Sequence, residues 1–215
     1  MKLVVPTITA KDLQEFNDQA DLIASFSNFA HIDIAEASFK NATSLIPYNE
    51  VYIEPVLTSS VHIMYEDPTL AVKAILGLAE SPRMIILQAE SDPHRLKESI
   101  ELIQDAKALF GLALLQDTEP DDCAELIEQA NQVLIFSGNL GEHGGTADLT
   151  LTPKISRIKR HNSKVEIAWD GGINSLNIED LAKAGVDVFY VGGAIHQAED
   201  PAGELRKLQE LVENV

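Results

Sequence analysis

The chain has 215 residues, of which 45% are hydrophobic, and these values suit one domain, residues 1–215, with a sizeable core. Its formal net charge of −18 argues against binding to nucleic acid or to anionic membranes. The single cysteine, Cys123, excludes a disulfide or a multi-thiolate metal cluster within one chain. We find neither a signal-peptide pattern at the start nor an apolar run of the roughly 18 residues that a membrane helix needs. We therefore expect a soluble, cytoplasmic protein.

Short apolar runs rich in β-branched residues alternate with polar segments of helical periodicity along almost the whole chain. Eight runs are predicted strands: 3–7, 29–34, 60–65, 84–88, 110–115, 132–137, 165–170 and 186–192. The predicted helices are 10–24, a short or irregular one near 48–57, then 67–79, 93–107, 120–130, 153–161, 175–184 and 201–212. Eight strand and helix pairs in this length favour the α/β class and a single (β/α)8 TIM barrel over an open, doubly wound sheet.

Polar side chains lie on the inward face of three predicted strands. In the second strand, His31 and Asp33 alternate with apolar residues, and in the third strand His62 and Met64 do the same. Asp170 ends the seventh strand, directly before a pair of glycines. Active sites of such barrels lie at the carboxyl ends of the strands. We therefore expect two imidazoles and two carboxylates to meet at the barrel mouth.

This set of four side chains has two chemical uses. Two His nitrogens and two carboxylate oxygens suit Zn²⁺, Fe²⁺ or Mn²⁺, and the ligand types alone do not choose among these metals. Carboxylates from different strands can also stand on opposite faces of a substrate carbon, one removing a proton and the other returning it. A single inward-facing His is more often a hydrogen-bonded structural residue, but four such groups together favour a site.

Two glycine pairs follow the last strands. Gly171 and Gly172 come after the seventh strand, and Gly192 and Gly193 come after the eighth. Loops at these positions hold phosphate in many barrels through backbone N–H groups. The alternative is that the glycines only form tight turns, but two consecutive pairs favour a phosphorylated substrate.

Three motifs resemble those of the ribulose-phosphate 3-epimerase family, and the similarity extends over nearly the whole chain. The His-x-Asp motif is present at 31–33, Val-His-x-Met at 61–64 and Asp-Gly-Gly at 170–172. The segments 184–187, 191–195 and 199–201 resemble the end of that family's barrel.

The resemblance implies a divalent metal, Zn, Fe, Mn or Co, held by His31, Asp33, His62 and Asp170, with Asp33 and Asp170 as the acid/base pair. It implies inversion at C3 of a ketopentose 5-phosphate, converting D-ribulose 5-phosphate into D-xylulose 5-phosphate through a cis-enediolate. It further implies a homo-oligomer. The implied substrate-binding residues are Thr7, Met64, Gly144, Gly145, Gly171, Gly172, Gly192 and Gly193.

Several positions depart from the family pattern. Thr7 replaces a Ser, Ser60 replaces an Asp, and the segment after the His-x-Asp motif lacks its Met and Gly. The loop 138–146, which corresponds to the family's lid, carries Glu142 and His143 as new polar groups that contact substrate or face solvent. Two alternatives therefore stay open: a related barrel enzyme acting on another sugar phosphate, by epimerisation of a ketohexose 6-phosphate or an aldol-type step, and a noncatalytic sugar-phosphate-binding protein.

Overall fold

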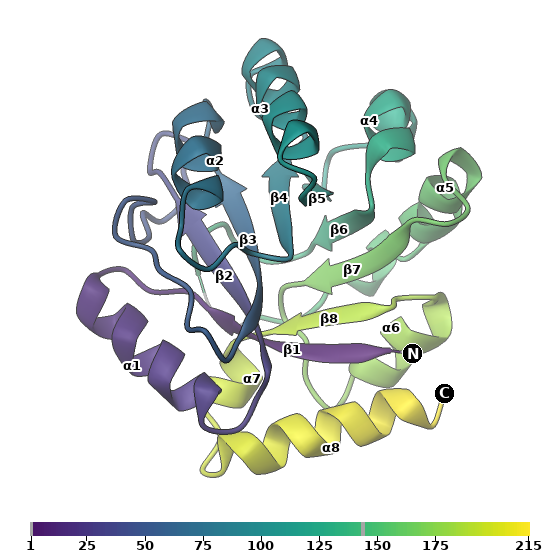
Figure 1. Cartoon of the computed structure of the whole chain (residues 1–215). Helices are drawn as coiled ribbons and strands as arrows, with labels where there is room; N and C mark the ends of the chain where they lie inside the picture. The colour runs from purple at the N-terminus through teal and green to yellow at the C-terminus, as the bar shows by residue number, and fades with distance from the viewer. Residues whose placement is uncertain (1, 143–144) are drawn as a thin grey trace.

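The computed structural model describes residues 2–142 and 145–215 and contains a closed barrel of eight parallel strands in the order β1 to β8 (Figure 1). The strands are β1 (Leu3–Ile8), β2 (Phe29–Ala35), β3 (Thr58–Met64), β4 (Met84–Gln88), β5 (Leu109–Leu114), β6 (Gln132–Phe136), β7 (Glu166–Asp170) and β8 (Val188–Val191). The helices are α1 (Leu13–Ala24), α2 (Thr69–Leu76), α3 (Pro93–Asp105), α4 (Ala124–Gln129), α5 (Pro153–His161), α6 (Ile178–Ala184), α7 (Gly193–His196) and α8 (Pro201–Glu213). The (β/α)8 barrel predicted from the sequence is confirmed.

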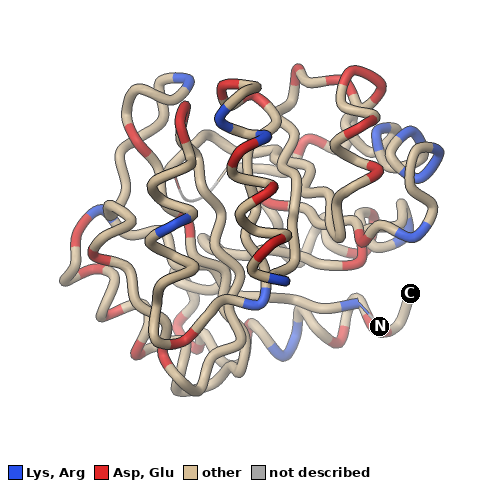
Figure 2. The backbone as a smooth tube through the Cα atoms, turned by 45° about the horizontal axis from the view of Figure 1, so that its top comes forward, with Lys and Arg blue, Asp and Glu red and all other residues tan. Residues whose placement is uncertain are grey.

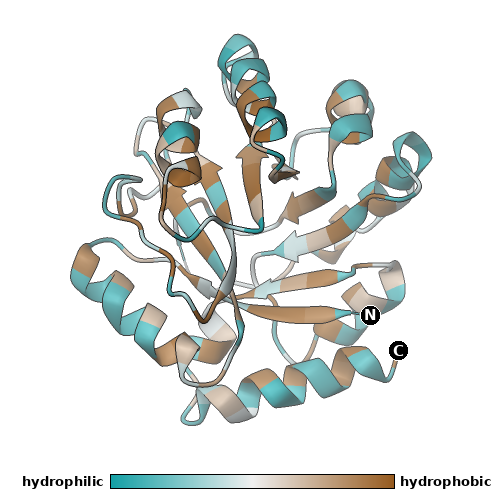
Figure 3. Cartoon of the chain, viewed as in Figure 1, coloured by the Kyte–Doolittle hydropathy of each residue, from teal (hydrophilic) through white to brown (hydrophobic). Residues whose placement is uncertain are grey.

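Two apolar layers hold the barrel together. A small layer fills its interior and includes Val5, Ile86 and Leu134. A larger layer lies between the strands and the surrounding helices, and it includes Ile32 and Trp169. Figure 3 shows this arrangement as apolar strands ringed by helices whose outer faces are hydrophilic. Successive strand residues point to opposite sides of the sheet. Apolar residues at every second position therefore face the helices, and the positions between them face the barrel interior, where polar groups can lie.

Local signals set the start of several helices. The side chains of Asp12, Asp92 and Asp200 accept hydrogen bonds from backbone N–H groups in the first turns of α1, α3 and α8. Pro93 and Pro201 occupy the first helical positions of α3 and α8. A backbone N–H at that position makes no hydrogen bond within the helix, so its absence from proline costs nothing there. The helices α3 and α8 therefore begin where the sequence predicted, whereas α1 begins at Leu13 rather than at residue 10.

The helix predicted near 48–57 is wrong, because this segment contains only turns and irregular backbone. Pro55 lacks the N–H that a helix would need in the middle of this segment. The preceding residues bond to distant segments instead: Thr43 N–H donates to Leu140 O at 3.0 Å and Ile46 N–H donates to Ala10 O at 2.8 Å. Tertiary hydrogen bonds thus take the place of helical ones between β2 and β3.

Acidic residues outnumber basic ones by 34 to 16, and Figure 2 shows them distributed over the helices and loops around the barrel. Some are paired, such as Asp121 with Arg157 and His161 on neighbouring elements. Within the described part of the chain, no helix combines the length and apolar character needed to cross a membrane.

Candidate metal centre

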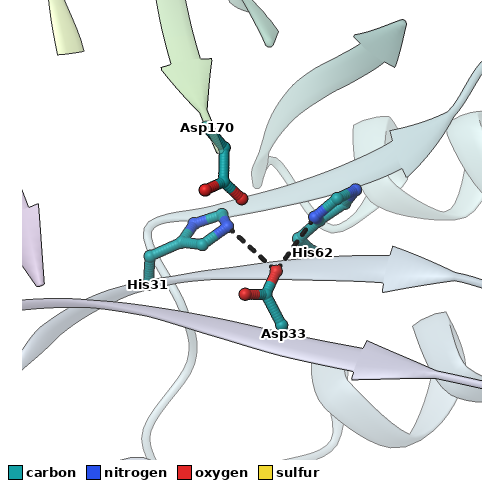
Figure 4. A group of neighbouring side chains, drawn as sticks. All are labelled: His31, Asp33, His62 and Asp170. Atoms are coloured by element: carbon teal, nitrogen blue, oxygen red, sulfur yellow. Dashed lines mark hydrogen bonds and ion pairs between the residues drawn. The ribbon is translucent and has the colours of Figure 1, made fainter. Parts of the chain in front are cut away.

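Strand register brings the predicted site residues together at one end of the barrel. In the pairing of β2 with β3, His31 lies opposite Ser60 and Asp33 lies opposite His62. Asp170 is the last residue of β7 and approaches the same centre from across the barrel (Figure 4). One ligand atom from each of His31, Asp33, His62 and Asp170 lies within 4.8 Å of all the others, and all four residues are buried. The predicted cluster is therefore present in the structure.

Asp33 is the hub of this cluster. Its Oδ1 lies 3.0 Å from His62 Nδ1 and 3.3 Å from His31 Nε2, the two contacts drawn in Figure 4. Its Oδ2 accepts a hydrogen bond from the Thr9 hydroxyl at 2.9 Å. Oδ1 thus faces the imidazoles, while Oδ2 is oriented by Thr9, which follows the last residue of β1.

A chain of hydrogen bonds inside the barrel orients His31. His31 Nδ1 lies 2.8 Å from Ser60 Oγ, and Ser60 lies 3.5 Å from the Tyr190 hydroxyl. Tyr190 donates to Gln132 Oε1 at 2.8 Å, and Gln132 Nε2 donates to the Glu166 carboxylate at 2.7 Å. A carboxylate only accepts, so every donor points toward Glu166 and His31 carries its proton on Nδ1. The Tyr190 ring also stacks on His31, with centroids 3.7 Å apart.

His62 has a different kind of partner. Its Nδ1 faces Asp33, while its Nε2 lies 2.9 Å from the amide nitrogen of Gln88, the last residue of β4. Gln88 is fully buried, and its Oε1 has no hydrogen-bond partner. His62 is therefore held between a charged carboxylate and a neutral amide.

The two carboxyl groups have opposite electrostatic environments. Burial alone would raise the pKa of Asp33, but the electrostatic influence of the adjacent His31 and His62 imidazoles outweighs it and holds this pKa well below its usual range. Burial, followed by the nearby charge of Asp33, raises the pKa of Asp170 to about 7. Burial likewise raises the pKa of the Tyr190 hydroxyl, which therefore stays protonated and can donate.

A cavity of about 450 Å³ opens above the centre, at the carboxyl ends of the strands. The substrate-binding residues predicted from the sequence that line it are Thr7, Met64, Gly145, Gly171, Gly172, Gly192 and Gly193. Gly144 and His143 lie outside the described residues. No Lys or Arg is among the described residues that line this cavity.

The loops after β6 and β7 pack backbone against backbone at the rim of the cavity. A Cβ on Gly172, whose φ is +71°, would lie 2.2 Å from Ala147 N. Only glycine permits this approach. Across the mouth, Glu142 lines the cavity and accepts hydrogen bonds from Thr43 and Asn139 at 3.3 and 3.1 Å. Glu142 thus ties the predicted lid loop to the loop after β2.

Sequence reasoning missed three residues of the site: Thr9, Gln88 and Tyr190. The period-two alternation of their strands contained the signal, because Thr7 and Thr9, like Ile86 and Gln88, fall on the inward face. Each residue looked unremarkable, since a Thr, a Gln or a Tyr at a strand end is common without a function.

The model of the ribulose-phosphate 3 epimerase family matches residues 3–196. The chain belongs to this family. It is 29% identical over 217 residues to the ribulose-phosphate 3-epimerase of Helicobacter pylori strain J99, with 96% of each chain covered. It is 26% identical to the enzyme of that name from Aquifex aeolicus, covering 99% of this chain and 97% of the other.

Solved structures share the architecture at lower identity. The 3-hexulose-6-phosphate synthase of Salmonella typhimurium superposes with a TM-score of 0.67 at 20% identity, covering 100% of this chain and 99% of the other. KGPDC from Streptococcus mutans superposes with a TM-score of 0.75 at 12% identity, with 100% and 99% covered. At these identities the likeness concerns the fold alone.

Proposed function

We propose that the chain is a metal-dependent isomerase that inverts C3 of a ketopentose 5-phosphate, interconverting D-ribulose 5-phosphate and D-xylulose 5-phosphate. The observation that carries this proposal is the cluster of two imidazoles and two carboxylates within 4.8 Å at the barrel mouth of a ribulose-phosphate 3-epimerase family member. The relatives of that name cover nearly all of the chain.

The donor set fits a divalent metal. His31 Nε2 is buried without a hydrogen bond and, with the proton on Nδ1, directs a lone pair toward Asp33 Oδ1 only 3.3 Å away. Two electron-rich atoms at this distance repel each other unless a proton or a metal cation lies between or beside them. We propose that His31, Asp33, His62 and Asp170 hold it, and nitrogen and oxygen donors of this kind suit Zn, Fe, Mn or Co. A bound metal would act as a Lewis acid that stabilises negative charge on the substrate oxygens.

Asp33 and Asp170 are the proposed acid/base pair. They come from β2 and β7, which are not neighbours in the barrel, so their carboxyl groups approach a substrate carbon from different directions. One removes the C3 proton to form a cis-enediolate and the other delivers a proton to the opposite face. The hydrogen bond from Thr9 keeps Asp33 Oδ2 in one orientation during this exchange. Met64 and Thr7 border the reacting carbons from the cavity wall.

The glycine loops after β7 and β8 are the proposed phosphate site. Gly171, Gly172, Gly192 and Gly193 line the cavity, and α7 begins at Gly193. Loops at these positions bind phosphate in many barrels through backbone N–H groups. A ketose phosphate bound there would extend its carbon chain toward Asp33 and Asp170.

The deciding experiment incubates the metal-loaded protein with D-ribulose 5-phosphate in D₂O and follows the C3 proton by NMR. We expect D-xylulose 5-phosphate to appear with deuterium at C3, and chelator-treated protein to lose this activity. Asp105→Asn, an exposed acidic position at the end of α3, is a matched control that keeps it. If the protein binds metal and catalyses exchange on a ketohexose 6-phosphate but on no ketopentose phosphate, the substrate is the ketohexose 6-phosphate instead. Absence of exchange on either would overturn the proposed reaction.

Three further expectations stay predictions: that residues 1–215 form one domain, that the protein is a cytoplasmic homo-oligomer, and that it does not bind nucleic acid. Size-exclusion chromatography with light scattering tests the oligomer.

A further inference from the structure

The partners of the two imidazoles differ in one chemical property. The hydrogen-bond chain beyond Ser60 ends at a carboxylate, so it supports His31 only with the proton on Nδ1. Gln88 carries both a donor and an acceptor on one planar amide, so it can support either neutral form of His62. The tautomer of His31 is thus fixed by its surroundings, whereas that of His62 is not.

In the structure, the contacts of His62 place its ring proton on Nδ1. Nδ1–H donates to Asp33 Oδ1 at 3.0 Å, and Nε2 accepts from the Gln88 amide nitrogen at 2.9 Å. Nδ1 is the ring nitrogen that faces the centre, as Figure 4 shows, so it is the atom that would bind a metal. A nitrogen that binds a metal carries no proton, and the ring proton must then reside on Nε2. Nε2–H would face the NH₂ group of Gln88, and two donors would oppose each other.

Rotation of the Gln88 amide removes this conflict. Half a turn about the last side-chain bond places Oε1 where Nε2 now lies, so that Oε1 accepts from His62 Nε2–H. Oε1 is buried and makes no hydrogen bond at present, so the rotation breaks none that it makes. The number of hydrogen bonds between the two side chains is one before and one after. The proton moves from Nδ1 to Nε2, and the ring stays neutral.

We propose that Gln88 is a positioning residue whose amide reverses when the centre takes up its metal, and that it thereby selects the metal-binding tautomer of His62. This inference rests on the proposed function, because it requires a metal at the centre. A partner hydrogen-bonded to the second nitrogen of a metal-ligating His typically changes metal affinity by 10–100-fold when it is removed.

Three variants separate this role from a structural one. Gln88→Met keeps the length of the side chain but supports neither tautomer, so we expect zinc affinity to fall by about 10–100-fold. Gln88→Glu offers only acceptor oxygens, so we expect zinc affinity at least equal to that of the wild type. Gln116→Met is the matched control, because Gln116 donates only to Ser137 O and does not contact an imidazole. Competition with a chromophoric chelator measures the zinc affinity of the wild type and of the three variants.

The tautomer itself is observed in ¹⁵N-histidine-labelled protein by two-bond ¹H–¹⁵N correlation, with His62 assigned from a His62→Asn variant. We expect Nδ1 to be the protonated nitrogen in the metal-free wild type and Nε2 in the zinc-bound form. In Gln88→Glu, Nε2 should be protonated even without zinc, because it then faces a carboxylate that only accepts, an effect that a purely structural residue would not produce.

The outcomes distinguish this inference from the proposed function. Zinc binding by the wild type with the same protonated nitrogen in both states would overturn the role of Gln88 and leave the metal centre standing. Wild-type zinc affinity in Gln88→Met would do the same. Failure of the wild type to bind zinc, Mn²⁺, Fe²⁺ or Co²⁺ would overturn the metal centre and this inference with it.

Discussion

Asp33 and Asp170 belong to one cluster but receive different support from the protein. Asp33 accepts hydrogen bonds from Thr9 and His62 and lies beside His31. Asp170 has no such partners among the described side chains, and burial and the charge of Asp33 raise its pKa to about 7. These environments therefore favour the ionised form of Asp33 and the protonated form of Asp170 at neutral pH, relative to exposed carboxyl groups.

Replacement of either carboxylate tests the proposed acid/base roles. We expect Asp33→Asn and Asp170→Asn each to reduce turnover by about 10²–10⁴-fold, because an amide cannot accept or deliver the C3 proton. Turnover should be measured at a metal concentration that saturates each variant, since both residues are also proposed ligands. Asp105→Asn is the control. Asp170→Asn with more than a tenth of wild-type turnover would contradict the assignment.

Metal affinity should depend on pH through Asp170. Its carboxyl must lose its proton to bind a metal, and its pKa is raised to about 7 in the metal-free protein. Below pH 7 the proton competes with the metal, so this group should lower affinity by up to about tenfold per pH unit. Above pH 7 it is already ionised and contributes no further change. Chelator competition at pH 5.5, 6.5, 7.5 and 8.5 measures the slope, and equal affinities at pH 5.5 and 7.5 would contradict it.

At the scale of elements, the loops after β2 and β6 join across the mouth. Thr43 N–H donates to Leu140 O at 3.0 Å, and the Thr43 hydroxyl donates to Glu142 at 3.3 Å. Gly141 lies directly against this junction, where a Cβ would be 2.1 Å from Thr43 O. The close approach of Gly141 to Thr43 therefore helps to fix the position of the predicted lid loop.

Gly141→Ala and Gly145→Ala form a matched pair that tests this junction. Both positions have positive φ, +74° and +85°, so both alanines carry the strain of a left-handed backbone, about 1–2 kcal/mol. Only the alanine at 141 also meets the Thr43 carbonyl, because among the described residues, chain neighbours aside, no atom lies within 4 Å of a Cβ at 145. We expect Gly141→Ala to reduce the unfolding free energy more and to expose the loop to proteolysis. Urea unfolding and limited proteolysis compare the two variants. Equal unfolding free energies and equal protease sensitivity would show that the contact between residue 141 and Thr43 does not hold the loop in place.

The same elements show what the sequence could and could not predict. Alternation in β2 and β3 was enough to place His31, Asp33 and His62 on the inner face, and the glycine pairs marked the mouth. The helix predicted at 48–57 was wrong because Pro55 interrupts the segment and the chain leading into it is held by bonds to distant residues, such as Ile46 N–H to Ala10 O, which local periodicity does not record. Gln88 was missed because its importance comes from its contact with the His62 ring on the neighbouring strand β3, and strand pairing is visible only in the fold.

At the scale of the whole molecule, the formal charge of −18 is spread over the outside of a closed barrel. Some acidic groups are paired, but the excess leaves many without a basic neighbour. Self-repulsion of this kind destabilises the compact state and is screened by salt.

Stability should therefore rise with ionic strength. Between about 0.01 M and about 0.15 M salt the Debye length falls from about 30 Å to about 8 Å. We expect the unfolding midpoint to rise by about 2–4 °C, which corresponds to about 1 kcal/mol at this chain length. Trp169, the single tryptophan and fully buried, reports the transition by fluorescence. NaCl and KCl should act alike, and an unchanged or lower midpoint would contradict the argument.

The cavity lining described above, with glycines and no Lys or Arg among its described residues, has a consequence for mutational studies. Alanine substitution of the non-glycine residues in these loops deletes side chains but leaves every backbone N–H in the proposed phosphate site in place, so it would report those positions as tolerant. Gly172→Ala is the exception, because its Cβ would lie 2.2 Å from Ala147 N. Reagents that modify lysine or arginine would give the same silent result. The site would respond only to substitutions that add bulk at Gly172 or Gly193 or remove an N–H with proline. Side-chain deletion and chemical modification of lysine or arginine would therefore underestimate the functional importance of this site.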